Sequence, residues 1–221
     1  MSTRLKFAKM HGLGNDFMVI DAINQAFTAD ATLIKQWSDR YDGVGFDQML
    51  VVEKPDSDEA AFRYRIYNAD GGEVAQCGNG ARCFARFVRE QGLTQLDIIP
   101  VQTNAGLLYL ESIDATRVRV NMGIPRFEPR QIPLAAAARQ PQYQMELDGQ
   151  QIIFSALSIG NPHMVMQVDD VASAEVARLG PLLESHALFP QHANIGFSQI
   201  VDKTRFKLRV YERGVGETRA C

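Results

Sequence analysis

The chain has 221 residues, 46% of them apolar, and a formal charge of −3 at pH 7. A chain of this length buries roughly 70% of the surface that its unfolded form exposes, so we expect one large or two small globular domains rather than a disordered or fibrous protein. Charges of both signs are interspersed along it, which predicts no basic face for nucleic acid and no polybasic segment for a membrane. The expected partner is a small molecule.

The N-terminal residues lack the apolar core of a signal peptide, and no apolar run approaches the length of a membrane span. We therefore expect a soluble, cytoplasmic protein. The cysteines are Cys77, Cys83 and Cys221, and their spacing is not that of metal ligands. In a reducing compartment this favours free thiols over a disulfide framework, and we expect no metal site.

In the first half of the chain, alternation of apolar and polar residues predicts strands at 6–10, 62–67, 107–113 and 117–122. Asp30 can cap a helix that stops near Gly43. A second helix is predicted to follow Cys77, because the apolar residues after it recur at helical spacing. Cys83 lies on the apolar side of that helix and is expected to be a packed core residue.

In the second half, a hairpin is predicted over residues 145–157, with its turn at Asp148 and Gly149. A helical pattern runs from Val171 and is expected to end at Pro181. Between the halves, residues 123–142 contain four prolines and have the composition of a linker. We therefore predict an N-terminal half over 1–121 and a C-terminal half over 122–221.

The two halves share an internal repeat. Residues 62–77 align without a gap to residues 206–221, at a constant offset of 144. Unrelated segments of this length would share about one identical position. The identical pairs are Phe62/Phe206, Arg65/Arg209, Tyr67/Tyr211, Gly72/Gly216, Glu73/Glu217 and Cys77/Cys221. This pattern predicts an α+β protein built from two related domains, with Glu73 and Glu217 supporting the turns before the cysteines.

A cysteine at the start of a helix has two chemical uses. The amide groups and the positive end of the helix dipole lower the pKa of a thiol, and they also bind a carboxylate. Duplicated halves usually face each other across a pseudo-twofold axis, which would place Cys77 and Cys221 on opposite walls of one cleft. Two opposed thiols suit a racemase without a cofactor, because one thiolate can remove a proton from a stereocentre while the other thiol delivers one to the opposite face.

Six segments of the chain resemble diaminopimelate epimerases. They read HGLGNDF, GFDQ, YNADGGEVAQCGNGARC, SIGNPHMV, LFPQHANIGF and YERGVGETRAC. The resemblance implies two similar domains, each a curved, barrel-like mixed sheet wrapped around a central helix, with the active site in the cleft between them.

The resemblance also implies an activity. Members of the family interconvert LL- and meso-2,6-diaminopimelate, a precursor of lysine and of peptidoglycan, without pyridoxal phosphate or a metal. Cys77 and Cys221 would be the acid and base, with His163 and Glu212 tuning the thiols. The implied substrate-binding residues are Asn15, Gln48, Asn68, Gly78, Asn79, Asn161, Asn194, Glu212 and Arg213. The same resemblance is compatible with a homodimer.

Family members continue beyond the second cysteine into a helix and further strands. The resemblance therefore implies that the second domain is incomplete here, and we expect that a polypeptide of only these residues folds poorly or partly and has little epimerase activity.

Two other functions stay open. The chain could be another cofactor-independent racemase or isomerase of the same fold. It could also be a non-catalytic, redox-responsive binding protein whose two thiols form a disulfide. Pyridoxal phosphate chemistry is disfavoured, because none of the six lysines has a setting that suggests a Schiff base.

Overall fold

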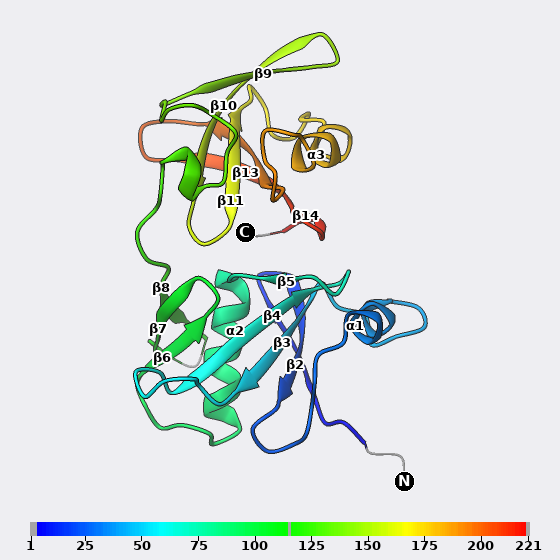
Figure 1. Ribbon diagram of the computed structural model, residues 1–221, viewed down its shortest axis with the longest axis vertical. Helices are drawn as coiled ribbons and strands as arrows, with labels where there is room; N and C mark the ends of the chain where they lie inside the picture. Colours follow the sequence, from blue (N-terminus) through cyan, green and yellow to red (C-terminus); the bar gives the residue numbers. More distant parts are fainter. Residues whose placement is uncertain (1–3, 115, 220–221) are drawn as a thin grey trace. The chain divides into compact units, whose positions relative to one another are not determined.

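The structure is a computed structural model that describes residues 4–114 and 116–219. The chain divides into two compact units, Met1–Gly123 and Ile124–Cys221 (Figure 1). Each unit is described by itself below. Among the described residues, no helix is long and apolar enough to cross a membrane.

Unit 1 is a mixed sheet with two helices. Its elements are β1 (Ala8–Gly12), β2 (Asn15–Asp21), α1 (Ala31–Ser38), β3 (Gln48–Glu53), β4 (Phe62–Asn68), β5 (Glu73–Val74), α2 (Gly78–Glu90), β6 (Ile98–Thr103), β7 (Gly106–Ser112) and β8 (Val118–Asn121). The strand order is β1-β2-β3-β4-β6-β7-β8, and β5 pairs with β4. The β2–β3 and β4–β6 pairs are parallel and the other pairs are antiparallel. This is the mixed sheet that the family resemblance implies.

Helix α2 is the centre of unit 1. It contacts β1 at one edge of the sheet and β7 and β8 at the other, so the sheet curls around it (Figure 1). Alternate residues of β2, β3 and β4, such as Phe17, Leu50 and Ile66, pack with Phe84 of the helix in one buried cluster. The residues between them face the other side of the sheet, where they form a second cluster with Ile34 of α1. Period-two strands thus bury both faces of this sheet.

The β1–β2 connection fixes the position of Asn15. Leu13 and Gly14 form a two-residue turn with φ values of 56° and 91°, as a type I′ hairpin turn requires. Gly12 and Asn15 are therefore paired directly across the hairpin. This turn places β1 two residues later than the predicted strand 6–10.

Unit 2 has the same sheet motif. Its elements are a 3₁₀ turn (Pro129–Gln131), β9 (Tyr143–Leu147), β10 (Gln150–Ser158), β11 (Pro162–Gln167), α3 (Val176–Glu184), β12 (Asn194–Ile200), β13 (Phe206–Glu212) and β14 (Gly216–Thr218). The strand order is β14-β13-β12-β11-β10-β9, with β11 and β12 parallel. The predicted hairpin turn at Asp148 and Gly149 is confirmed, with φ values of 52° and 75°.

The internal repeat extends to the strand register. In unit 1, β4 and β5 pair Ile66 with Val74, and in unit 2, β13 and β14 pair Val210 with Thr218, which are the same positions 144 residues later. Upstream, the parallel pairs β2–β3 and β11–β12 also correspond. The matching partners are Phe17 with Gln48 and His163 with Asn194. The predicted duplication is therefore a duplication of structure.

Two helix boundaries were predicted wrongly. The helix capped by Asp30 ends at Ser38 instead of near Gly43, because Asp39 is extended and its carboxylate accepts backbone hydrogen bonds from Tyr41 and Asp42, which forms a turn. The second-half helix starts at Val176 and continues past Pro181 to Glu184. A proline removes a single donor from the hydrogen-bond ladder, and this short helix tolerates that loss.

Candidate active site

Cys77 is the N-cap residue of α2, as the sequence predicts. Its backbone is extended, and the backbone N–H of Gly80 donates to its Sγ over 3.5 Å. The Tyr64 hydroxyl, from β4, donates to the Cys77 carbonyl over 3.3 Å. Sulfur takes the capping role that an oxygen side chain usually has, so the thiol lies at the positive end of the helix dipole.

Gly80 allows this helix start to approach the sheet. A Cβ at this position would lie 2.3 Å from the Tyr64 hydroxyl oxygen and 3.1 Å from a methyl group of Leu50. Tyr64 and Leu50 are both fully buried, so neither can move aside. The first turn of α2, and with it Cys77, is therefore held against β3 and β4.

Gly78 and Asn79 are the first two residues of α2. The N–H groups of a first helical turn point away from the helix, where they can bind an anion together with the dipole. The Asn79 side chain is buried, and its Oδ1 accepts a hydrogen bond from the Arg82 guanidinium. At Gly12, on β1, a Cβ would lie 3.1 Å from the Asn79 carbonyl, so this strand also packs closely against the helix start.

Three buried amides line neighbouring strand ends in unit 1. Asn15 begins β2, Gln48 begins β3 and Asn68 ends β4, and all three are at most 3% exposed. Gln48 Nε2 donates to Asn68 Oδ1 over 2.8 Å. The Oε1 atom of Gln48 is buried and accepts no hydrogen bond from any residue in the described part of the chain. A buried acceptor of this kind is ready to bind a ligand donor.

Asn15 connects this group to the thiol. Its Oδ1 lies 3.9 Å from Cys77 Sγ, and its Nδ2 donates to the carboxylate of Asp47 over 2.9 Å. The structure thus brings Asn15, Cys77 and the start of α2 together, although they are separated by 62 residues in the sequence.

In unit 2, His163 and Asn194 form a corresponding polar group on β11 and β12. Asn194 Oδ1 accepts from the backbone N–H of Arg213 over 2.9 Å, which leaves its Nδ2 to face His163 Nε2 at 3.4 Å. This arrangement requires Nε2 to be an acceptor, so the imidazole is neutral. Burial, together with the charge of Arg213, lowers the pKa of His163 to about 4, which agrees with that state.

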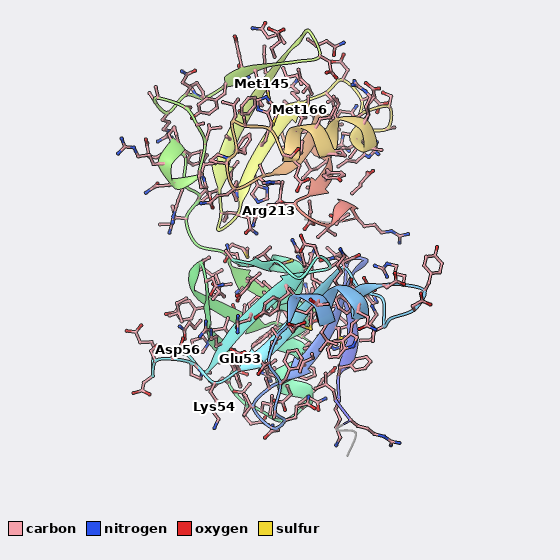
Figure 2. All side chains as sticks on the ribbon, turned by 45° about the vertical axis from the view of Figure 1, so that its right-hand side comes forward. Glu53, Lys54, Asp56, Met145, Met166 and Arg213 are labelled. Carbon is pink, nitrogen blue, oxygen red and sulfur yellow. The ribbon has the colours of Figure 1, made fainter. Side chains whose placement is uncertain are left out.

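Charged residues follow this group at the end of β13. Glu212 is 7% exposed, and its Oε1 accepts from the Thr218 hydroxyl over 2.6 Å. Arg213 directly follows β13 (Figure 2), and its Nη1 donates to the Gln191 carbonyl over 2.7 Å. Asn161 precedes β11 and is partly buried. Unit 2 therefore holds the ionisable members of the predicted substrate-binding set.

The repeated glutamates support the turns before the cysteines. Glu73 accepts two hydrogen bonds of 2.8 Å from Arg65, and Glu217 accepts two, of 2.6 and 2.9 Å, from Arg209. Each of these bidentate arginine–glutamate pairs, called forks below, joins a short strand, β5 or β14, to the strand beside it. The hydrogen bonds from Arg65 hold the pKa of Glu73 below its ordinary value.

The other two cysteines are Cys83 and Cys221. Cys83 is 4% exposed within the core of unit 1, which confirms the predicted core position, and burial raises its pKa to about 11, which disfavours the thiolate. Cys221, the predicted partner of Cys77, lies outside the described residues. In the described part of the chain, no group of three His, Cys, Asp or Glu residues could hold a metal ion.

Sequence reasoning missed three residues beside the site: Asp47, Arg40 and Thr218. Asp47 was included in the segment GFDQ without a role, and Arg40 lies in the loop after α1. Thr218 occupies the repeat position of Val74, so a hydroxyl in place of an apolar residue was the available signal.

The sequence profile of one family, described as diaminopimelate epimerase, matches residues 7–128 and 155–221. The chain belongs to the diaminopimelate epimerase family. A diaminopimelate epimerase from Nitrosomonas europaea is 54% identical over 218 residues, which are 99% of this chain and 79% of that protein. One from Thioalkalivibrio sulfidiphilus is 55% identical over 219 residues, again 99% of this chain and 79% of the relative.

Solved structures of other members of the fold are more distant. The crystal structure of a probable proline racemase from Agrobacterium radiobacter superposes on this chain with a TM-score of 0.73 at 12% identity. The aligned region covers 98% of this chain and 73% of the racemase chain. At this identity the likeness shows the fold alone. The predicted α+β fold is thereby confirmed.

Proposed function

We propose that this protein interconverts LL- and meso-diaminopimelate through a two-base reaction, with Cys77 and Cys221 as the acid and base. Membership of the epimerase family supports the substrate. The observation that carries the mechanism is the position of the Cys77 thiol, which lies between a donor, the Gly80 N–H, and an acceptor, Asn15 Oδ1. A thiol placed in this way can exist as thiolate or as thiol, which both halves of the reaction need.

The proton balance is simple. One cysteine, as thiolate, takes the proton from the α-carbon, and the C–H electron pair stays on the carbon as a carbanion. The other cysteine, as thiol, gives its proton to the opposite face and becomes the thiolate. Configuration is inverted, the two cysteines exchange protonation states, and no oxidant or cofactor is consumed. The proposal accordingly includes no cofactor.

The start of α2 would stabilise the carbanion. The backbone N–H groups of Gly78 and Asn79 would bind the carboxylate next to the reacting carbon, where negative charge develops as the proton leaves. These donors belong to a helix that Gly80 holds rigidly against the sheet, so they would not have to reorganise during the reaction.

The polar residues of both units would recognise the distal amino acid end of the substrate. The buried Oε1 of Gln48 suits an ammonium group, and the guanidinium of Arg213 suits a carboxylate. The proposed set also includes Asn15, Asn68, Asn161, Asn194 and Glu212.

His163 and Glu212 are proposed to tune the thiols. A neutral imidazole adds no positive charge beside a cysteine, whereas an imidazolium would favour the thiolate alone. Because the pKa of His163 is lowered to about 4, its neutral form persists at neutral pH. We also propose a cytoplasmic location, and the family resemblance leaves room for a homodimer.

Substrate choice is tested by incubating the complete protein, expressed from its whole reading frame, in deuterium oxide with LL-diaminopimelate, proline, trans-4-hydroxyproline and glutamate, and by measuring deuterium at each α-carbon. We expect exchange with diaminopimelate alone. Exchange with proline or glutamate instead would indicate another racemase of this fold, and exchange with none, together with diaminopimelate binding that survives alkylation of Cys77, would indicate a binding protein.

A further inference from the structure

The carboxylate of Asp47 has a defined position next to the predicted site. It lies directly before β3, and one of its oxygens, Oδ2, accepts two hydrogen bonds: one from Asn15 Nδ2 over 2.9 Å and one from the backbone N–H of Asp16 over 3.0 Å. Both donors belong to the start of β2. Asp47 therefore contacts the side chain that faces the Cys77 thiol.

This contact determines which way the Asn15 amide points. A carboxylate accepts hydrogen bonds but cannot donate one, so only the NH₂ end of the Asn15 side chain can face Asp47. The carbonyl end then faces the opposite way, and Oδ1 lies 3.9 Å from Cys77 Sγ. With the amide reversed, two oxygens would meet at Asp47 and an N–H group would face the sulfur.

Asp47 is itself held in place. Arg40 donates to Asp47 Oδ1 over 2.6 Å, and it also donates to both carboxylate oxygens of Asp16 over 2.8 and 3.1 Å. The backbone N–H of Asp47 donates in turn to Asp16 Oδ1 over 2.9 Å. Partial burial raises the pKa of Asp16, but hydrogen bonds from Arg40 and Lys9 outweigh it and hold this pKa well below its usual range. Asp16 is thus ionised at neutral pH, and Asp47 is held by hydrogen bonds from several sides.

We propose that Asp47, anchored by Arg40, is a positioning residue for the reaction: it fixes the Asn15 amide so that a carbonyl oxygen, and not an N–H group, faces the Cys77 sulfur. This inference rests on the proposed function for its meaning in catalysis. A carbonyl acceptor stabilises the protonated thiol, while the Gly80 N–H stabilises the thiolate. With both present, neither protonation state is strongly favoured, as an alternating acid and base requires.

Other charged and titratable groups surround this position. Asp16 is on β2, Lys9 is on β1 and contacts Asp16, Arg82 of α2 binds Asn79, and Tyr64 of β4 donates to the Cys77 carbonyl. Of these, Asp16 is the matched comparison for Asp47. It shares the same arginine and carries the same charge, but its side chain makes no hydrogen bond to the Asn15 side chain among the interactions that the structure describes.

The test measures the pH dependence of Cys77 alkylation in the wild type, Asp47→Asn and Asp16→Asn. After iodoacetamide treatment at a series of pH values, tryptic digestion releases residues 66–82, which contain Cys77 and neither of the other cysteines. An asparagine at 47 can donate as well as accept, so the Asn15 amide can turn and present an N–H group to the sulfur. We expect the alkylation midpoint of Asp47→Asn to fall by about 0.5–1 pH unit, and that of Asp16→Asn to move by less than about 0.3.

Two results would overturn the proposal: an unchanged midpoint in Asp47→Asn, or an equal shift in both variants, which would mean that lost negative charge alone is responsible. Arg40→Gln leaves Asp47 and Asn15 in place but removes the hydrogen bonds that Arg40 makes to Asp47 and Asp16, so it should shift the midpoint the same way by a smaller amount. If Asp47→Asn does not fold, Arg40→Gln takes its place in the test. An unchanged alkylation midpoint in Arg40→Gln would then contradict the proposal. Alkylation needs no turnover, so a failure of the proposed function would appear separately, as absent diaminopimelate exchange in the wild type.

Discussion

The hairpins β4–β5 and β13–β14 have the same frame but different surroundings. Both carry an arginine–glutamate fork, and both have the same strand register. In unit 1 the inward side chains Phe62 and Tyr64 are buried under α2, whereas their counterparts Phe206 and Leu208 are 66% and 45% exposed in unit 2. Phe62 and Phe206 are the same residue in the two copies, so the difference in their burial comes from what packs against each hairpin and not from the side chain itself.

The side chains at corresponding strand ends of the two units also differ. Where unit 1 has Phe17, Gln48 and Asn68, the corresponding positions of unit 2 are His163, Asn194 and Glu212. The set of unit 1 is uncharged, and that of unit 2 contains two ionisable side chains. The set of unit 2 can therefore make charged hydrogen bonds that the set of unit 1 cannot.

The largest expected effect on stability comes from a glycine in each unit. Gly80→Ala should lower the free energy of unfolding by about 2–3 kcal/mol, because its Cβ would lie 2.3 Å from the buried Tyr64 hydroxyl. In Gly180→Ala the Cβ would lie 2.5 Å from the ring of Tyr211, but alanine also favours the helix, so a smaller loss of about 1–2 kcal/mol is expected. Denaturant titration of both variants measures this.

Gly78→Ala is the matched control for Gly80→Ala. Its Cβ would lie 3.5 Å from Met122 and 4.0 Å from Arg82, and both are ordinary contacts. It should change stability by less than about 1 kcal/mol. Equal losses in the two variants would mean that the helix start is not held by close packing at Gly80.

One pH effect on stability should come from His163 in unit 2. Burial lowers the pKa of His163 from 6.5 to about 4, so the unfolded chain binds more protons than the folded one between these values. The stability that the neutral imidazole contributes is fully present above pH 6.5 and is lost as the pH falls toward 4. The free energy of unfolding should fall by roughly 1–3 kcal/mol across this range from His163.

His163→Gln should remove this part of the pH dependence, and the repeat position in unit 1, Phe17, cannot titrate. NMR titration of the ring protons of His163 gives the folded pKa directly. A midpoint near 6.5 in the folded protein would contradict the assignment of a buried, neutral imidazole.

The smallest expected effects come from the two forks. Glu73→Gln and Glu217→Gln should each lower the free energy of unfolding by about 0.5–1 kcal/mol, because each weakens a bidentate, partly exposed ion pair. Glu90→Gln, in an exposed helical pair with Arg86, is the control and should cost less than either of these variants. A loss in only one fork variant would show that the two copies of the hairpin no longer share the same support.

Much of this frame could be predicted from the sequence because it depends on local pattern. The repeat, the cap at Cys77 and the turn at Asp148 and Gly149 follow from identity, helical spacing and turn chemistry. The end of α3 could not be predicted in this way, because the cost of one proline is weighed against packing on β12 and β13.

The surroundings of the thiol were less accessible to sequence reasoning. The hydrogen bonds of Asp47 with Asn15 and Asp16 span 32 and 31 residues, and they depend on the parallel register of β2 and β3, which alternation alone does not define. The close approach of Gly80 to Tyr64 likewise depends on how α2 packs against the sheet. The family resemblance supplied the identity of the site residues, and the structure supplies the contacts that orient them.

The central claim is that two different cysteines move the proton. The direct test is to start from LL-diaminopimelate in deuterium oxide and to measure deuterium at the α-carbons in the first few per cent of reaction. We expect the meso product to carry one solvent deuterium while the remaining LL substrate carries almost none, since the acid on the far face draws its proton from solvent. Product that retains the substrate's own hydrogen would contradict the account, because a single base would then have moved the proton from one face to the other.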